Sequence, residues 1–436
     1  MFDVFSALFK TAGGPVLVGL GLIVLYNVFL LTGINAGPVI AILVATSPLW
    51  LPVILFFLAV EFWLFYSRRA FMIANGRVSL RIMLPQEVFK SPAAMESVIA
   101  QIHNPNSADN PWQGWIDGKH PLIYSFELVS IGGEVRFYVN VPRRKTKNAI
   151  EAQLYAQYPG IEIIEEPIEY TAEIPWDPDR YEYMGFRMGK KEAQEFPIKT
   201  YIDFGLDKMP KEEEKVEPMA PLLEQLAAIQ PHERLWVQIL ARPHVKKTFK
   251  AGNLRESGTW ESKVHAKIDD LLGRVKGSKL GPAEFESQPR LTTGERDMIA
   301  AMERNAGKYP YETTIRWLYI TEKGKFNGDL ISPMLRAFSE FDIIGRNGVA
   351  IKWRTDFDYN IFQDPRGTKK MAYKKRELQD YKLRQYVYRT AEDQPKIMTC
   401  EEIATLFHIP GRSVITPSLN RIPSTRSEAP ANLPVG

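Results

Sequence analysis

Basic and aromatic side chains are interspersed from Arg366 to Arg389 (RGTKKMAYKKRELQDYKLRQYVYR), which makes this segment the clearest candidate for binding. Cations neutralise phosphate groups and tyrosine rings stack on bases, so the combination is typical of nucleic-acid contact. The same composition suits a helix near anionic lipid head groups. A solvated structural helix has the same pattern. The residues predicted to contact nucleic acid or lipid are Lys369, Lys370, Tyr373, Lys374, Lys375, Arg376, Tyr381, Lys382 and Arg384.

No arrangement of residues in the sequence predicts catalysis. The phosphate-binding motif G-x-x-x-x-G-K-[ST] does not occur, and its nearest approach, Gly185 followed by Gly189-Lys190-Lys191, lacks a residue between the glycines and a hydroxyl for magnesium. The six histidines are scattered and form no H-E-x-x-H pair. We therefore expect no catalytic, cofactor-binding or metal-binding residues, and a protein that is not an enzyme.

Composition limits the possible classes of protein. The chain has 436 residues, enough for two or three packed domains, and its net charge of +4 means that any basic surface is local. The only cysteine, Cys400, cannot form an intrachain disulfide, which fits a reducing compartment. Since it precedes Glu401 and Glu402 at a predicted helix start, we expect it to have no chemical role.

The N-terminal part of the chain predicts a membrane anchor. No charged side chain occurs between Lys10 and Glu61, and this region contains two apolar stretches, Pro15 to Thr32 and Pro38 to Tyr66. Each is as long as a membrane-spanning helix. We therefore expect residues 1–70 to form a transmembrane helical hairpin, although Pro48 and Pro52 leave one or three crossings open, and a buried hairpin in a soluble protein is the alternative.

Charges beside the apolar stretches predict the orientation. Lys10 precedes the first stretch, and four arginines follow the second, at Arg68, Arg69, Arg77 and Arg81. Because basic residues favour the cytoplasmic side, both termini and all soluble domains should be cytoplasmic, on a multi-pass protein of the cell membrane.

Two soluble domains should follow, in an α+β fold. Residues 78–168 show the order β-α-β-β-α-β, with Leu122–Ile131 and Val135–Val141 as a hairpin joined by Gly132-Gly133. This order predicts a ferredoxin-like domain. Residues 195–360 predict a second such domain, in which Ile198–Phe204 is the first strand, and a lysine-rich helical insertion at about 245–309 is either a contact surface or an ordinary solvated excursion.

The C-terminal part should continue with a basic helix and a short amphipathic helix in residues 366–409. Residues 410–436 are rich in proline, serine, arginine and asparagine without periodicity, which is typical of an extended tail.

Four stretches carry a resemblance: LIYSFELVSIGGEVRFYVNVPRR, AIEAQLYAQYPGIEI, EPMAPLLEQLAAI and EEIATLFHIPGRSVITPSLNRIPSTRSEAPANLP. With the membrane hairpin, they resemble the membrane-associated region, a domain of unknown function, that precedes conjugation-type or type IV secretion ATPases in uncultivated small-genome bacteria. In such proteins the ATPase would follow the ATLFHIPG and ANLP segments, and this chain stops at Gly436 without it.

The resemblance implies a non-enzymatic, membrane-anchored component of a type IV secretion or conjugation-like machine that recruits a separate P-loop ATPase. Membrane lipids, DNA and further copies of the chain are the other expected partners. The alternative is a membrane-tethered protein that binds nucleic acid through residues 366–389.

Overall fold

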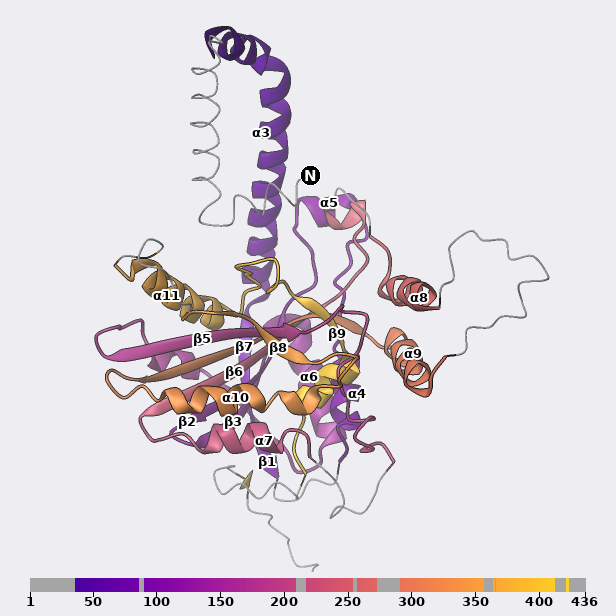
Figure 1. Ribbon diagram of the computed structural model, residues 1–436, viewed down its shortest axis with the longest axis vertical. Helices are drawn as coiled ribbons and strands as arrows, with labels where there is room; N and C mark the ends of the chain where they lie inside the picture. The colour runs from indigo at the N-terminus through magenta and orange to yellow at the C-terminus, as the bar shows by residue number, and fades with distance from the viewer. Residues whose placement is uncertain are drawn as a thin grey trace, which may run out of the picture.

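In the computed structural model, the helices and strands join into one body from which a single long helix projects (Figure 1). The structure describes residues 36–85, 90–208, 217–253, 257–272, 291–356, 364, 366–411 and 421–422. The first predicted membrane helix, Pro15–Thr32, and most of the predicted tail at 410–436 lie outside these residues.

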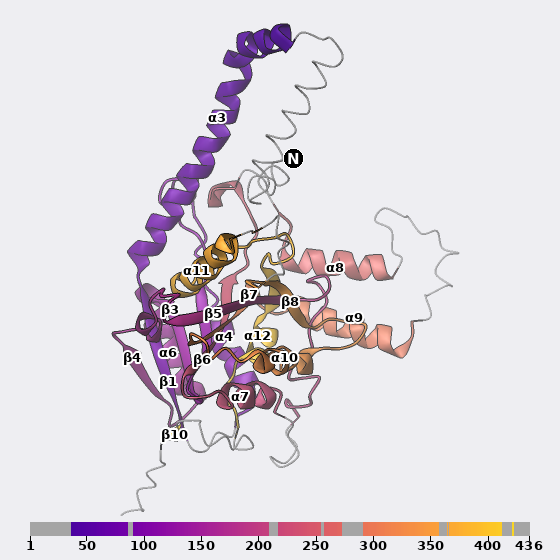
Figure 2. The same cartoon turned by 60° about the vertical axis from the view of Figure 1, so that its left-hand side comes forward.

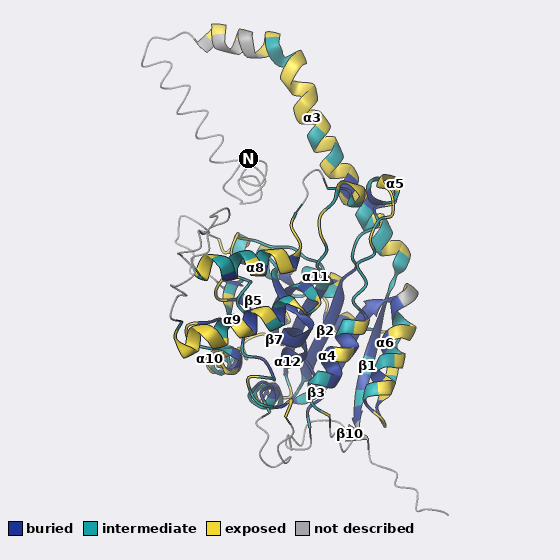
Figure 3. Ribbon diagram, turned by 90° about the vertical axis from the view of Figure 1, so that its right-hand side faces the viewer, coloured by how far each residue is buried: buried dark blue, intermediate teal, exposed yellow. Residues whose placement is uncertain are grey.

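The projecting helix is α3, Ala36–Asn75, which contains Pro48 and Pro52. Its stretch from Val44 to Asn75 is long and apolar enough to cross a membrane. The side chains along its outer part are exposed, and burial begins near Leu64, where the helix reaches the body (Figure 3). The described residues therefore contain one apolar helix rather than the predicted hairpin.

A single ten-stranded sheet forms the centre of the body. Eight strands follow the order β10-β1-β3-β2-β6-β7-β5-β8, while β4 pairs with β1 and β9 pairs with β7. The pairs are antiparallel except β1 with β10. The strands are β1 (Arg77–Pro85), β2 (Tyr124–Ile131), β3 (Glu134–Pro142), β4 (Glu162–Glu166), β5 (Tyr181–Lys190), β6 (Glu233–Pro243), β7 (Pro310–Glu322), β8 (Val349–Arg354), β9 (Lys396–Thr399) and β10 (Arg421–Ile422).

The two halves of the sheet share one strand order. In the first half the order is β4-β1-β3-β2, and in the second it is β8-β5-β7-β6. Strands β2 and β6 join them as antiparallel neighbours, with Glu127 opposite Gln238. The segments predicted as two soluble domains therefore contribute to one continuous sheet.

Helices cover one face of this sheet and enclose the largest apolar core. Side chains from alternate strand positions, such as Phe126 on β2 and Trp317 on β7, meet these helices. The helices are α4 (Ala93–Gln101), α6 (Arg143–Gln157), α7 (Ala220–Ala227), α10 (Ile331–Arg336) and α12 (Cys400–Leu406), with the short turns η5 (Gly328–Leu330) and η6 (Ser339–Phe341) beside α10.

The opposite face of the sheet is covered by α11, Thr368–Leu383, and by the segment around η1, Tyr170–Glu173. Tyr170, Trp236 and Tyr381 belong to the second apolar core, which lies on this face. Figure 2 shows α11 near the base of α3. The central strands β2, β6 and β7 are consequently buried on both faces.

The predicted insertion forms a separate helical pair. Helices α8 (Trp260–Leu271) and α9 (Thr293–Ala306) pack through Trp260, Val264 and Met302 in a third apolar cluster. They project from the side of the body in Figure 1. Two further short elements, α5 (Pro111–Trp115) and η3 (Phe249–Ala251), lie near the base of α3.

The predicted strand at Ile198–Phe204 is wrong, because β5 is the first strand of the second half. Residues 201–208 form turns instead, and the backbone N–H groups of Ile198 and Tyr201 donate to Glu402 and Thr405 of α12. These side-chain acceptors satisfy backbone groups that would otherwise need a neighbouring strand. The apolar residues of this segment therefore pack beside α12.

Candidate functional site

The residues predicted to bind nucleic acid or lipid separate into an exposed and a buried group along α11. Lys375 and Arg376 are exposed, whereas Lys369, Lys370, Tyr373, Lys374 and Lys382 are half-buried. Tyr381 and Arg384 are only 1% and 2% exposed. An external ligand cannot reach these last two, so the prediction that they contact nucleic acid or lipid is corrected.

Arg384 is buried because it completes an ion network with the sheet. Its Nε and Nη2 atoms lie 2.7 and 3.1 Å from the two carboxylate oxygens of Glu127 on β2, and its Nη1 lies 2.7 Å from Glu169. The Tyr170 hydroxyl donates to Glu127 over 2.7 Å and lies 3.1 Å from that of Tyr381. Such bidentate pairing of an arginine with a carboxylate is strong and fixes the relative orientation of the two groups.

The backbone of Arg384 adopts a conformation that this network must hold. Its φ of 51° lies in the left-handed region, where it ends α11. That region is costly for a residue with a Cβ. Burial alone would raise the pKa of Glu127, but the charge of Arg384 holds it below its usual value, so the carboxylate stays ionised.

A second group of ion pairs fixes the middle of α11. Arg187 on β5 donates to both oxygens of Glu377, at 2.9 Å from Nε and 2.5 Å from Nη2, and contacts Asp393 at 3.2 Å. Arg316 on β7 donates to the Asp380 carbonyl over 2.9 Å, and burial lowers its pKa to about 10. Arg187 thus pairs with buried carboxylates and Arg316 with backbone carbonyls, so this network joins α11 to the sheet.

The half-buried side chains of α11 also have partners in the body. Lys370 and Lys374 pair with Asp356 at 2.6 and 3.1 Å, and the Tyr373 ring packs on Trp353. The Lys382 ammonium donates to the Ile174 carbonyl over 2.6 Å. Lys375 and Arg376 thus remain the most accessible cations of the predicted set.

The base of α3 is the second feature that bears on function, because a single residue separates the helix from the sheet. Asn75 ends α3, Arg77 begins β1, and Gly76 alone lies between them with a φ of 60°. Its N–H donates to Ile73, and its carbonyl accepts from Arg143. A glycine at this position ends a helix sharply. The connection between α3 and β1 is therefore a single residue held by two backbone hydrogen bonds.

Arg77 fastens this junction to the neighbouring strand. Its Nε donates to Asn140 on β3 over 2.6 Å, and its Nη1 donates to the Ile123 carbonyl over 3.0 Å. Burial, together with the positive charge of Arg384, lowers its pKa to about 9. A cavity of about 200 Å³ lies here between the base of α3 and the end of α11.

Helix α5 and turn η3 contact the side of α3, and we call these two elements with their flanking residues, 110–118 and 246–252, the collar. The Trp63 indole donates to the Trp115 carbonyl over 2.7 Å, and the Trp115 indole donates to the Phe249 carbonyl over 2.8 Å. Arg68 donates to the Gly252 carbonyl over 3.0 Å. The collar therefore contacts α3 between Trp63 and Arg68.

Glycines allow the collar to close backbone to backbone. A Cβ at Gly114 would overlap the Lys250 carbonyl oxygen, and one at Gly118, whose φ is 65°, would overlap the backbone of Ser67 on α3. Asn110 caps α5 by accepting from the Gln113 N–H over 3.0 Å. Sequence reasoning missed this site, although the W-Q-G-W-I-D-G run combines its tryptophans and glycines.

The amphipathic helix α12 lies in the core rather than on the surface. Its glutamates Glu401 and Glu402 are buried, and Glu402 lies 2.7 Å from the buried Lys190 ammonium on β5. Burial raises the pKa of the Cys400 thiol to about 12. Cys400 thus begins the helix as an unreactive buried group, and no cluster of metal-ligating side chains occurs among the described residues.

A larger cavity, of about 720 Å³, opens between α9 and the loop around Ile344. Its cations are paired with acids of the same region, Arg346 with Asp203 at 2.6 Å and Arg304 with Glu401 at 3.2 Å. Glu295 and Asp297 of α9 also line this cavity, so its two arginines face several carboxylates.

Comparison with family models gives one match, described as "Domain of unknown function (DUF8128)", over residues 76–341. This is more than half of the chain. The chain belongs to the DUF8128 family. The DUF8128 region begins at Gly76, directly after α3, and ends in η6, so it includes the collar but not α11 or α12. No curated protein and no solved structure matches the chain.

Proposed function

We propose that this DUF8128 protein is a membrane-anchored structural component whose anchor and body move as one unit. The observation that carries the proposal is the base of α3, where Gly76 is the only residue between α3 and β1 and the collar accepts hydrogen bonds from Trp63 and Arg68. An anchor that only retained the body at a membrane would need no such attachment, whereas one that transmits force or fixes orientation does.

The proposed anchor consists of two spans, Pro15–Thr32 and a second within α3, and places the body in the cytoplasm. Support comes from the uncharged stretch between Lys10 and Glu61 and from Arg68 and Arg69 beyond it. Protease added to the cytoplasmic face of membrane vesicles should digest the body and leave a protected N-terminal fragment. Digestion from the opposite face only would contradict this orientation.

The body itself is proposed to contain two ferredoxin-like units joined edge to edge. Each half has the chain order β-α-β-β-α-β, and both halves share the strand order described above. The β2–β6 pairing covers an edge that each unit would otherwise leave open. The result is a broad, stiff platform at the membrane.

We further propose that this platform belongs to a type IV secretion or conjugation-like machine and recruits a separate P-loop ATPase. The support is the resemblance of the four quoted stretches to regions that precede such ATPases, together with the lack of a phosphate-binding loop in the sequence. A rigid anchored platform would orient the motor against the membrane.

The test is purification of the tagged full-length protein in mild detergent after cross-linking in its own cells, followed by mass spectrometry. An untagged culture treated identically is the control. Enrichment of a P-loop ATPase over the control is the expected result. Recovery of the protein alone, with no ATPase enriched, would contradict recruitment.

Nucleic-acid binding is the competing function, and the exposed Lys375 and Arg376 are the residues that would support it. Replacing both with glutamine should weaken DNA binding and lower its dependence on salt concentration if α11 contacts phosphates. Unchanged binding would separate any affinity for DNA from this helix.

A further inference from the structure

The collar leaves large apolar side chains exposed at the end of the body from which α3 projects. Trp112 is 66% exposed, Ile116 is 40% exposed, and Phe249 is 55% exposed. Figure 1 shows α5 beside α3 at this end. Side chains of this size and exposure, gathered on two adjoining elements, mark a contact surface.

The length of α3 determines what this surface meets. The hydrocarbon core of a bilayer, about 30 Å thick, needs about 20 helical residues, and α3 contains no charged side chain before Glu61. The membrane boundary on the side of the body is therefore expected near Trp63 and Leu64. Trp63 is the residue whose indole donates to the collar, and Leu64 is where burial against the body begins.

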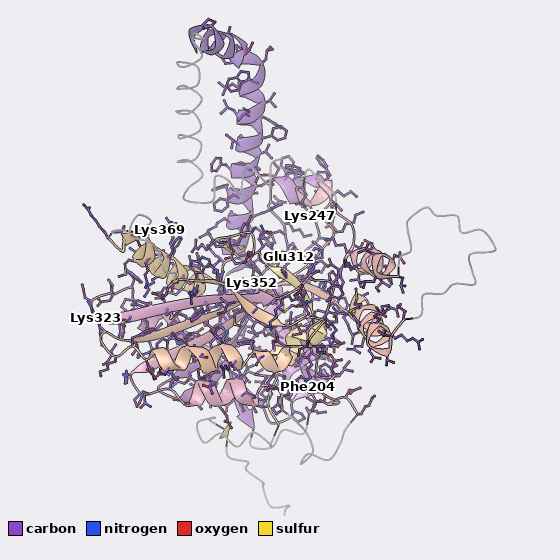
Figure 4. The ribbon with its side chains drawn as sticks, in the orientation of Figure 1. Phe204, Lys247, Glu312, Lys323, Lys352 and Lys369 are labelled. Atoms are coloured by element: carbon purple, nitrogen blue, oxygen red, sulfur yellow. The ribbon has the colours of Figure 1, made fainter. Side chains whose placement is uncertain are left out.

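The composition of the collar matches that boundary. Tryptophan and other aromatic side chains concentrate at the level of the lipid head groups, where an apolar ring and a polar environment are both available. Exposed Lys246, Lys247 and Lys250 adjoin Phe249, and such cations are attracted to anionic lipids. Figure 4 shows Lys247 at this end of the body, with Lys369 of α11 also toward it and Phe204 toward the opposite end.

We propose that the collar is a second membrane-contact site, which inserts Trp112, Ile116 and Phe249 among the head groups of an anionic bilayer. This proposal rests on the proposed function in one respect, because α3 must span the bilayer for the collar to reach it. The membrane spans and the collar are then separate attachments on one rigid body, and together they fix the tilt of the platform against the membrane. The spans without the collar would constrain that tilt less.

Close contacts at two glycines keep the backbone of the collar packed against the protein and out of the lipid. Gly114 and Gly118 bring α5 against η3 and α3, so the collar is held by the protein and presents only side chains outward. The backbone carbonyls of Trp115, Phe249 and Gly252 accept hydrogen bonds from Trp63, Trp115 and Arg68, respectively. Backbone at this depth is tolerated when it is paired within the protein.

The experiment uses the full-length protein in nanodiscs that contain anionic lipid, with one environment-sensitive fluorophore on a substituted cysteine. The variants are Trp112→Cys and Phe249→Cys in the collar, Phe56→Cys on the exposed apolar part of α3, and Ile344→Cys as the control. Ile344 is fully exposed beside α9, and native Cys400 is buried. Nanodiscs carry a nitroxide quencher either on the head group or deep in the acyl chain.

Labels at Trp112 and Phe249 should lose emission with the head-group quencher and emit at shorter wavelength than the label at Ile344. The label at Phe56 should respond to the deep quencher. If Phe56 responds while Trp112 and Phe249 behave like Ile344, the collar proposal is overturned and the anchor stands. If Phe56 does not respond either, both the anchor and the collar proposals fail.

Discussion

Replacing Arg384 with methionine should destabilise the body strongly, because it leaves Glu127 buried without its cation. Glu127 has no exposed side-chain surface, and Arg384 supplies both of its ionic contacts. Removing one partner of a buried pair costs about 3–5 kcal/mol. Hydrogen bonds to Glu127 from Ser125, Tyr170 and Gln238 remain, so we expect the lower end of that range.

The size of the effect can be followed by thermal unfolding in mild detergent. Buried Trp236 and Trp317 lie in the sheet, so tryptophan fluorescence reports on the body. The body has roughly 330 residues, and an unfolding entropy of about 2.1 cal/mol/K per residue gives about 0.7 kcal/mol/K for it. A loss of about 3 kcal/mol therefore corresponds to a fall in Tm of roughly 4 °C. Arg376→Met, an exposed change on the same helix, is the matched control and should alter stability by less than about 0.5 kcal/mol.

The pH dependence of Tm tests whether the unpaired charge of Glu127 causes the loss of stability. In the native protein the pKa of Glu127 is lowered, so its contribution is present above the unfolded value and is lost as pH falls through the folded value. In the variant, burial without Arg384 raises that pKa, and protonation relieves the cost as pH falls. The Tm difference between the two proteins should therefore shrink on acidification.

A second substitution, at Glu127, completes the test. Adding Glu127→Gln to Arg384→Met removes the unpaired charge and should recover part of the lost Tm. If Arg384→Met melts together with Arg376→Met, or if the Tm difference does not change with pH, the ion network does not hold α11 as described.

Three further predictions follow from the collar and from α12. Gly118→Ala should expose residues 104–121 to limited proteolysis, because the added Cβ overlaps the backbone of Ser67. Gly205→Ala is the control, since Gly205 also has a positive φ but has open space around it, and it should not increase cleavage. Equal cleavage of the two variants would refute the close packing at Gly118. His408, 2.7 Å from Glu217, has a raised pKa, so its contribution is complete below the unfolded pKa and is lost as pH rises through the folded one. His408→Gln should therefore flatten the decline of Tm as pH rises above about 6.5, the ordinary pKa of histidine, and an unchanged slope would contradict this. Because burial raises the pKa of Cys400 to about 12, the native thiol should resist a disulfide reagent at neutral pH and react after unfolding, and rapid native reaction would show that the site opens.

Much of the sheet could be predicted from the sequence, because β2, β3, β6 and β7 are rich in apolar and β-branched residues and are bounded by turn signals. Strand β5 could not. Its sequence, YEYMGFRMGK, includes two glycines and the charged Arg187 and Lys190, which are typical of exposed loops. These charges are buried because their partners, Glu377 and Glu402, arrive from α11 and α12 about 200 positions later.

The helix at α11 was predicted correctly, but its surroundings were not. A basic segment gives the same pattern whether it faces solvent, lipid or a buried acid. Arg384 meets Glu127 across 257 positions of sequence, and no local signal connects them. The collar was missed for another reason: α5 and η3 are too short to show periodicity, and their glycines indicate only that turns occur there.

The central claim is that anchor and body form one rigid unit at a membrane. The most direct measurement is the distribution of distances between two spin labels in nanodiscs, one at Leu58→Cys on the exposed part of α3 and one at Ile344→Cys on the body. A single narrow distribution, broadened by Gly118→Ala, is the result expected from the Gly76 junction and the collar. A broad distribution in the native background would contradict the claim.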